Sequence, residues 1–275
     1  DIEQLGQAPL TSMFFYGDNT LRPRGEWRPQ VHDSDGLLIH DGKTGEWRWR
    51  PLGNPADLQL SYHHVQDVEG FGLIQRDRQF GDFQDNEARY DRRPSMWVKP
   101  AGKNRQGWGK GAVVLVAIPS GAEPNAHIVA LFKPAEAVKA SGERHLKYTV
   151  TFGEPAITEQ PNARAVRTFV GTENAKDDSG EAMRLIVDFK GGDLAGLNPD
   201  APVVSQVSGG EGVEVVEHFV EYIEASDVWR LSILANPSAE QPLTLRGLLN
   251  KDDKPVTETW TYFLGPETDL RGNPR

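Results

Sequence analysis

Seven short apolar runs, separated by turn-forming residues, follow one another through the second half of the sequence. They read, in order, RAVRTFVG, MRLIVDF, APVVSQVS, GVEVVEHFVEYI, VWRLSILA, PLTLRGLLN and TETWTYFL. Each run has the length and β-branched content of a strand, and Gly, Pro, Asn or Asp residues lie between the runs. This spacing predicts a small β-sandwich of immunoglobulin type over residues 165–275. The sequence contains no cysteine, so the paired cysteines of antibody domains are absent.

The first half of the sequence is also rich in strand-like runs, but its loops are longer. Residues 112–118 and 127–132 are nearly continuous in apolar residues, and residues 145–152 alternate apolar with polar side chains. Many runs lack an obvious pairing partner in this half, which would leave strand edges exposed. We therefore expect residues 1–152 to form the later part of a larger β domain. The polar, proline-containing stretch 153–164 is predicted to be an interdomain linker.

The charge and composition exclude several classes of function. A formal net charge of −10 opposes binding to nucleic acid or anionic lipid. Without cysteine, disulfide scaffolds, cysteine zinc sites and thiol nucleophiles are excluded. No apolar run approaches the ~20 residues that span a bilayer, and the N-terminal DIEQLGQAPL lacks the features of a secretory signal. We expect no nucleic-acid partner and no membrane insertion.

The stretch VHDSDGLLIHDG, at residues 31–42, concentrates aspartate and histidine around a short apolar core. Asp33-Ser34-Asp35-Gly36 resembles the start of a calcium loop, but a third ligand before the glycine and the later glutamate are both missing. The neighbouring histidines do not have the zinc-binding HExxH spacing: His32, His40, His63 and His64. We therefore expect no metal site and no cofactor.

Phosphate-binding and serine-hydrolase motifs are also incomplete. Gly42-Lys43-Thr44 ends like a phosphate-binding loop, but Leu37 occupies the position of the motif's first glycine. The glycine-rich stretch 107–111 lacks the strand-to-helix context that such loops need. No GxSxG motif is present for a nucleophilic serine. Both glycine-rich stretches are predicted to be turns.

Carbohydrate binding fits the aromatic residues of the first half. Sugars pack their C–H faces on aromatic rings and hydrogen-bond to carboxylate, amide and guanidinium groups. Trp47 and Trp49 share one face if their run is extended, and Trp97 lies near Arg89, Arg92 and Arg93 in the sequence. The alternative, equally compatible with composition, is that these rings fill a β-sandwich core.

Carboxyl groups for glycoside cleavage are available, but composition does not rank them. Such enzymes generally use one carboxyl group as an acid on the leaving oxygen and another to activate water or attack. The candidates are Asp33, Asp35, Asp41 and Glu46. An Asp-rich segment is also typical of a plain hairpin, because Asp and Gly favour turns.

Seven longer motifs resemble one known family. They are APLTSMFFYG, RPQVHDSDGLLIH, GEWRWRPL, GFGLIQRDRQF, ARYDRRPSMWV, GWGKGAVVLVAIP and HIVALFKP, spread in order from residue 8 to residue 134. They are similar to motifs of the periplasmic glucan biosynthesis proteins G and D, which act in osmoregulated periplasmic glucan synthesis. The region through TETWTYFL resembles the carboxyl-terminal domain of that family more loosely.

The resemblance implies an all-β fold: a large mutarotase-like β-sandwich followed by a small immunoglobulin-like one. The family's sandwich begins well upstream, so residues 1–152 correspond to its later part. The resemblance also implies a periplasmic location and a β-1,2-linked glucan as the partner. A homodimer is a further expectation.

The activity that the resemblance implies is cleavage within a β-1,2-glucan chain, with inversion at the anomeric carbon. The family's general base matches Asp33. The family's general acid lies in a motif of the form N-D-[HN]-I-V-A, which reads Asn-Ala-His-Ile-Val-Ala here and places Ala126 at the acid position. Tyr90 and Arg89 match a loop that reaches the family's active-site cleft, and Glu123 lies close to the acid position in the sequence.

Two functions therefore remain open. The first is an inverting endo-β-1,2-glucanase that Ala126 has inactivated, because loss of a positioned proton donor typically costs ~10²–10⁴-fold in rate. The second is a non-catalytic glucan-binding or scaffold protein of periplasmic glucan synthesis. For either function, the substrate-binding candidates are Tyr90, Arg89, Glu123, Trp47, Trp49 and Trp97.

Overall fold

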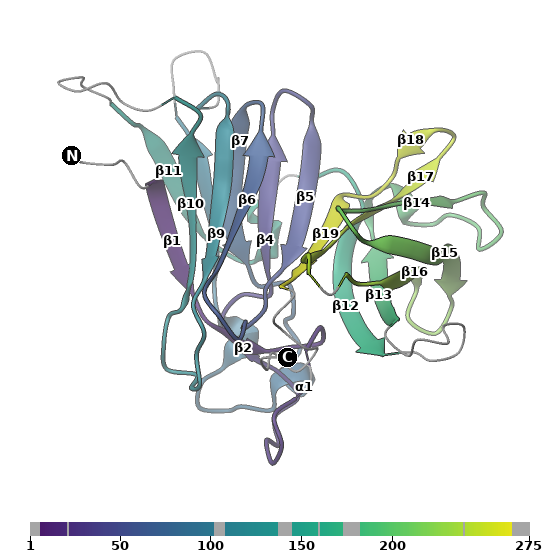
Figure 1. Cartoon of the computed structure of the whole chain (residues 1–275), viewed down its shortest axis with the longest axis horizontal. Coiled ribbons are helices and arrows are strands. Elements are labelled where there is room, and N and C mark those ends of the chain that lie inside the picture. Colours follow the sequence, from purple (N-terminus) through teal and green to yellow (C-terminus); the bar gives the residue numbers. More distant parts are fainter. Residues whose placement is uncertain are drawn as a thin grey trace.

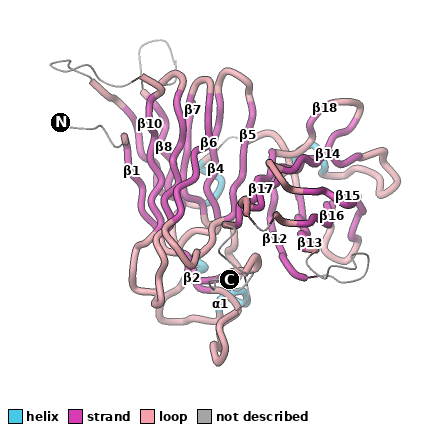
Figure 2. The backbone as a smooth tube through the Cα atoms, in the orientation of Figure 1, coloured by secondary structure: helices cyan, strands magenta, loops and turns pink. Residues whose placement is uncertain are grey.

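The computed structural model describes residues 6–20, 22–101, 108–136, 145–158, 160–172, 182–238 and 240–265. This part of the chain is built almost entirely from strands and loops (Figures 1 and 2). Its helices are single turns: α1 (Phe80–Phe83), η1 (Tyr90–Arg92), η3 (Pro155–Ile157) and η4 (Gly192–Leu194). The all-β fold predicted from the sequence is confirmed.

Three sheets form the two sandwiches. The outer sheet has the order β1 (Gln7–Ser12), β10 (Ile128–Pro134), β9 (Gly111–Ala117), β6 (Gln59–Val65). The central sheet has the order β11 (Tyr148–Gly153), β8 (Ser95–Pro100), β7 (Val68–Ile74), β4 (Gly36–Asp41), β5 (Glu46–Pro51), β19 (Thr259–Leu264), β17 (Leu243–Lys251), β14 (Val204–Gly209), with β18 (Lys254–Pro255) beside β17. The C-terminal sheet has the order β12 (Arg164–Thr172), β13 (Met183–Lys190), β16 (Val228–Asn236), β15 (Glu214–Ile223).

The seven runs predicted in the second half all form strands. They are β12, β13, β14, β15, β16, β17 and β19, and β18 is an additional two-residue strand. The C-terminal sheet packs against β14, β17 and β19 through one hydrophobic cluster, in which Leu185, Leu231 and Trp260 are fully buried.

The central sheet extends through both sandwiches. Strand β5 of the first half pairs in parallel with β19 of the second half, with Thr259 opposite Arg48 and Trp260 opposite Trp49. Figure 1 shows β19 where the two halves meet. The two sandwiches therefore share one sheet, while the predicted linker contains only the end of β11 and η3 before β12 begins at Arg164.

The two faces of β4 point into different cores. Leu37 and Ile39 belong to the cluster between the central and outer sheets, together with residues such as Phe71 and Phe132. Leu38, one residue along, belongs to the cluster of the second sandwich. This alternation explains why β4 is an almost continuous apolar run: both of its faces are covered.

Trp47, Trp49 and Trp97 lie on that second face and are buried, with 8%, 4% and 6% of their surfaces exposed. Glycines on the neighbouring strands leave room for these rings. A Cβ atom at Gly36 would lie 2.1 Å from the Trp49 ring, and one at Gly70 would lie 2.2 Å from the Trp97 ring. Trp49 and Trp97 therefore pack closely over a glycine on a neighbouring strand while belonging to the second core.

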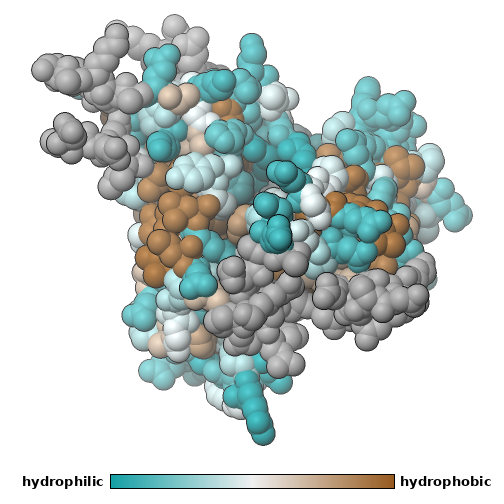
Figure 3. Space-filling model, in the orientation of Figure 1, coloured by the Kyte–Doolittle hydropathy of each residue, from teal (hydrophilic) through white to brown (hydrophobic). Residues whose placement is uncertain are grey.

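The prediction for residues 145–152 is only partly correct. Residues 148–153 form β11, but its alternating apolar residues are not a buried face: Tyr148 is 40% and Phe152 63% exposed. β11 lies at the edge of the central sheet, and only Val150 packs against the core. Figure 3 shows apolar surface on the first sandwich. On β6 of the outer sheet, Leu60 and Tyr62 are also exposed.

Candidate functional site

Asp33 follows a small ribbon at one end of the first sandwich, formed by β2 (Phe14–Tyr16) and β3 (Val31–His32). β2 and α1 lie together at this end in Figure 1. The backbone N–H of Asp33 donates to the carbonyl of Met13 at 2.9 Å. Its side chain is 34% exposed, and one carboxylate oxygen lies 3.2 Å from Nε of Arg93. Burial raises the pKa of Asp33, and the charge of Arg93 partly offsets this.

Asp33 is the candidate carboxylate with the fewest fixed partners. Asp35 accepts from the backbone N–H groups of Arg76 and Asp77, and Asp41 accepts from those of residues 43, 66 and 67. Glu46 accepts from Thr259 and Arg246. Within the described residues, no hydrogen-bond donor has good geometry toward the buried oxygen of Asp33. In the described part of the chain, this oxygen pairs only with the guanidinium of Arg93, whereas backbone N–H groups hold the carboxylates of Asp35 and Asp41.

Tyr90 lies beside Asp33 and connects it to a second group of charges. Its ring is 3% exposed and packs in a small cluster with Tyr16 and Phe83, and the guanidinium of Arg93 lies 5.6 Å from the ring centroid. Burial raises the pKa of the Tyr90 phenol to about 12, and nearby charges, Glu123 first among them, contribute. The phenol therefore stays protonated at neutral pH and can act as a hydrogen-bond donor.

Arg28 binds three carboxylates around this position. Its Nη2 lies 2.8 Å from Glu26 and 2.7 Å from Glu123, and its Nη1 lies 3.0 Å from Asp85. The hydrogen bond from Arg28 lowers the pKa of Glu26 to about 2. Burial of Tyr16 raises the pKa of its phenol, which donates to the Arg28 carbonyl. Arg28 thus holds segments around residues 26, 85 and 123 together.

The loop that contains Ala126 is attached to the same ribbon. Ala126 is exposed and lies between β9 and β10. Its neighbour His127 is buried, with Nε2 2.8 Å from the carbonyl oxygen of Phe14 and Nδ1 2.9 Å from that of Asn125. The consecutive carbonyls of Met13 and Phe14 therefore contact the backbone N–H of Asp33 and the imidazole of His127, the residue after Ala126.

Arg89 precedes Tyr90 in an unusual backbone conformation. Its φ of 49° lies in the left-handed region, which is costly for a residue with a side chain. The side chain makes a two-point contact with Asp91, at 2.9 and 2.6 Å, and lies over Phe80. The structure therefore places Arg89 on the same short turn as Tyr90, with its charge already paired.

Trp47, Trp49 and Trp97 are not brought to this site. They lie in the packed cluster described above, where they offer no open ring face to a sugar. Trp47 stacks on His40 on one side and on Trp97 on the other. Of the two interpretations that composition left open, the structure gives these three rings a packing role.

Trp27 and Arg28 were not singled out from the sequence, and Arg93 was named only together with Arg89 and Arg92. Trp27 is 65% exposed and lies beside Arg28, whose guanidinium is 6.0 Å from the ring centroid. Its signal was available: Trp27 lies in the turn-rich stretch RPRGEWRP, outside any alternating run, so no strand face would bury it. Nothing in the sequence separates Arg93 from the other arginines of its loop.

Two further observations concern metal binding and membrane crossing. In the part of the chain that the structure describes, no three His, Asp or Glu side chains gather closely enough to hold a metal ion. None of the helices found among the described residues is long and apolar enough to cross a membrane.

Comparison with known proteins identifies the family. The sequence profile described as "Periplasmic glucan biosynthesis protein, MdoG" matches residues 1–264. The chain is 40% identical over 268 residues to the "Probable glucans biosynthesis protein D" of Shewanella oneidensis, a match that covers 96% of this chain and 49% of the relative. The chain thus spans about half the length of that curated relative. From the profile match and this identity together, the chain belongs to the periplasmic glucan biosynthesis protein family.

Proposed function

We propose that this chain carries the general-base half of an inverting endo-β-1,2-glucanase that acts in periplasmic glucan synthesis, and that Ala126 leaves it without its general acid. The observation that carries the proposal is the position of Asp33. Its carboxylate lacks a fixed hydrogen-bond donor, and it lies beside Tyr90 and Arg93 at the end of the sandwich where residue 126 is anchored.

In the proposed reaction, Asp33 accepts a proton from a water molecule while the oxygen of that water bonds to the anomeric carbon. The bond to the glycosidic oxygen breaks on the opposite face, and that oxygen must gain a proton from an acid. Inverting enzymes hold the two carboxyl groups ~6.5–9.5 Å apart to leave room for the water, and a relay of waters would allow a longer gap. The raised pKa of Asp33 increases its proton affinity as a base.

Residue 126 is the position from which the leaving oxygen would receive its proton. A methyl group has no proton to give, so we propose that this chain binds glucan and cleaves it poorly. The surrounding groups still have roles in binding. Tyr90 can donate a hydrogen bond to a sugar hydroxyl, Trp27 can stack on a sugar ring, and Glu123 is held by Arg28 three residues before Ala126.

Restoring the acid tests this proposal. Ala126→Asp should be introduced into the longest polypeptide that carries this chain. It should increase the release of reducing ends from linear β-1,2-glucan by at least 100-fold, because a positioned acid contributes ~10²–10⁴-fold to the rate. The matched control adds Asp33→Asn to Ala126→Asp, which should remove the gain while glucan binding persists. No gain in reducing ends from Ala126→Asp would sink the proposal.

The second candidate is a non-catalytic protein that binds or escorts glucan in the periplasm. Ala126 favours it directly, because the chain as written lacks the acid. Calorimetric titration with β-1,2-glucan separates the two. Binding by the Ala126→Asp protein with no turnover, and no effect of Asp33→Asn on either property, would favour the scaffold.

A further inference from the structure

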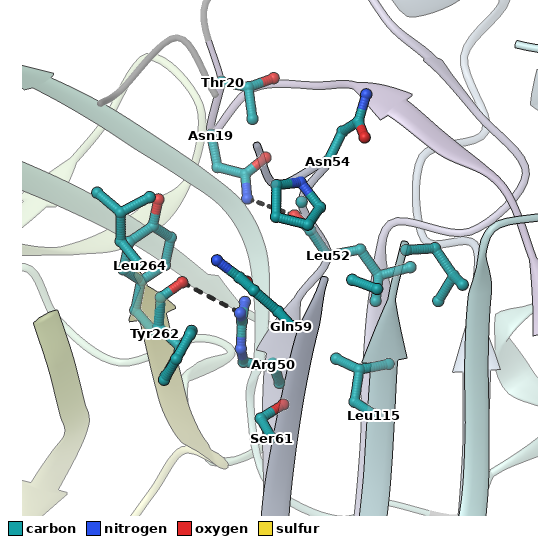
Figure 4. Close-up of a pocket in the computed structure, with 15 residues that line it drawn as sticks. Asn19, Thr20, Arg50, Leu52, Asn54, Gln59, Ser61, Leu115, Tyr262 and Leu264 are labelled. Atoms are coloured by element: carbon teal, nitrogen blue, oxygen red, sulfur yellow. Dashed lines mark hydrogen bonds between the residues drawn. The ribbon is translucent and has the colours of Figure 1, made fainter. Parts of the chain in front are cut away.

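A groove runs between β6 of the first sandwich and the strands β14, β17 and β19 of the second. Its cavity has a volume of about 420 Å³, and it meets a second, smaller pocket along a boundary that Arg50 and Tyr262 share. Figure 4 shows Arg50 in that neighbouring pocket, close to Gln59, Ser61 and Tyr262. None of the residues that we propose for glucan cleavage lines either space.

Arg50 is a buried cation without an acidic partner. Only 6% of the surface of Arg50 is exposed. Among the described residues, its guanidinium forms no ion pair with a carboxylate. Nη1 donates to the carbonyl of Pro51 and Nη2 donates to that of Phe263 at 3.1 Å, while Nε has no acceptor. The guanidinium packs 5.7 Å from the centroid of the Tyr262 ring.

Arg76, whose side chain is also largely buried at the junction of the sandwiches, is different. Arg76, whose side chain is 6% exposed, contacts Glu258 at 2.5 and 3.0 Å and also donates to the carbonyl of Ala165. A buried charge is costly unless it is paired and hydrogen-bonded. The neutral carbonyls around Arg50 satisfy part of its hydrogen bonding but do not balance its charge.

The positive charge of Arg50 reaches His63 on the wall of the groove. Burial lowers the pKa of Arg50 to about 10. Burial also lowers the pKa of His63, a lining residue of the groove, to about 3, and the charges of Arg50 and Arg48 add to this. Arg246 lines the same cavity, although Glu46 pairs with it. A positive pocket in a chain with a net charge of −10 is a local feature, not a property of the whole surface.

The remaining lining side chains suit a hydroxylated ligand. Ser208, Thr244 and Thr261 supply hydroxyl groups, and the exposed ring of Tyr62 forms part of the wall. A guanidinium is the side chain best matched to the planar oxygens of a carboxylate or the oxygens of a phosphate. The volume of the cavity exceeds that of a bare oxyanion, so a polar body attached to the anion also fits.

We infer that this groove is a second ligand site, which binds a small hydroxylated molecule through its carboxylate or phosphate group at Arg50. The bound oxyanion supplies the counter-charge that the fold omits. A neutral sugar can hydrogen-bond to the same walls but cannot supply that charge, and this difference distinguishes the inference from an ordinary sugar subsite.

The test is calorimetric titration of the whole chain with glucuronate, glucose 6-phosphate, inorganic phosphate and neutral glucose, at constant ionic strength in sodium chloride. We expect glucuronate or glucose 6-phosphate to bind at least tenfold more tightly than glucose. Preference for glucuronate identifies a carboxylate ligand, whereas preference for glucose 6-phosphate with measurable binding of inorganic phosphate identifies a phosphate ligand. Binding of glucose as tight as that of both acidic sugars, or no binding of any oxyanion, would overturn the inference.

Three variants locate the binding. Arg50→Met removes the charge and should weaken oxyanion binding at least tenfold. Because this variant can fail to fold, Ser61→Asp provides a second test. It adds a carboxylate to the lining that the two pockets share. This carboxylate should abolish oxyanion binding and should raise the midpoint of thermal unfolding in the absence of ligand. Lys190→Gln, the matched control, removes one exposed positive charge on β13 and should leave binding unchanged. Unaltered oxyanion binding by Ser61→Asp would contradict the proposed location.

Discussion

The imidazole of His127 lies 2.8 Å from the carbonyl oxygen of Phe14, across 113 residues of sequence. The preceding carbonyl, that of Met13, accepts a hydrogen bond from the backbone of Asp33. Two consecutive residues, Met13 and Phe14, thus hold the segment that carries the proposed base and the segment that carries residue 126. A substitution that breaks the contact between His127 and Phe14 should therefore alter catalysis, although neither residue is proposed to contact the substrate.

His127→Phe tests the anchor. In an Ala126→Asp background, loss of the contact with Phe14 should lower turnover of β-1,2-glucan more than tenfold, because misplacing a catalytic group is costly. Affinity for glucan, measured by calorimetry, should change less than threefold. His127→Gln, whose side-chain nitrogen can occupy the position of Nε2, should recover part of the turnover. Equal losses in both variants would contradict a positioning role.

Trp27 and Trp49 should respond in opposite ways to truncation. Trp27→Ala should weaken glucan binding at least fivefold with little change in the free energy of unfolding, because its ring is exposed. Trp49→Ala removes a buried ring and should lower the free energy of unfolding by about 3–5 kcal/mol. Urea denaturation and glucan titration of both variants provide the measurements, and a large stability loss in Trp27→Ala would refute its assignment as a binding surface.

Gly72 should be intolerant of any side chain. A Cβ atom there would lie 2.1 Å from the carbonyl oxygen of Met96 and 2.8 Å from the Trp97 ring. Gly72→Ala should therefore lower the free energy of unfolding by about 1–3 kcal/mol, the usual range for overpacking. Gly81→Ala is the matched control, because a Cβ atom at that position would have no neighbour within 4 Å. A difference of under about 0.5 kcal/mol between the two variants, within the range of ordinary surface changes, would count against this packing.

The buried carboxyl group of Asp35 should cause the free energy of unfolding to decrease as the pH rises. Burial raises the pKa of its carboxyl group to about 8, and Asp77 adds to the shift. An acid whose pKa is higher in the folded state than in the unfolded state contributes its full stabilisation below its pKa in the unfolded state, about 4. This stabilisation is lost as the pH rises through the pKa of the folded state. Asp35→Asn should flatten the dependence of the free energy of unfolding on pH between about 4 and 8. Denaturation at a series of pH values checks this, with exposed Asp227→Asn as a control that should leave the slope unchanged.

Local signals in the sequence were enough to predict most of the strands. The seven runs of the second half are short, rich in β-branched residues and bounded by turn residues, so neighbouring residues alone specify them. The parallel pairing of Trp49 with Trp260 has no local signal, because more than two hundred residues separate the partners. The burial of Trp49 depends on that pairing, and so its role could not be predicted from its own strand.

The candidate site was only partly accessible from sequence. The shared face of Trp47 and Trp49 follows from the period of two, and the structure confirms it. Whether that face meets solvent or a second sandwich is a tertiary property. The roles of Asp33 and Ala126 stay predictions that rest on motif resemblance. The interdomain linker at residues 153–164 and the homodimer also stay predictions.

The shared central sheet also constrains how the chain acquires its structure. More than two hundred residues separate β5 from its partner β19, so the edge of β5 stays open until β19 has been synthesised. Pairings between such distant segments form slowly, because the intervening loop must lose entropy before the contact forms. An unpaired edge invites association with other chains in the meantime. Removal of β19 should thus leave the first sandwich prone to aggregate, although no residue of its proposed site is lost.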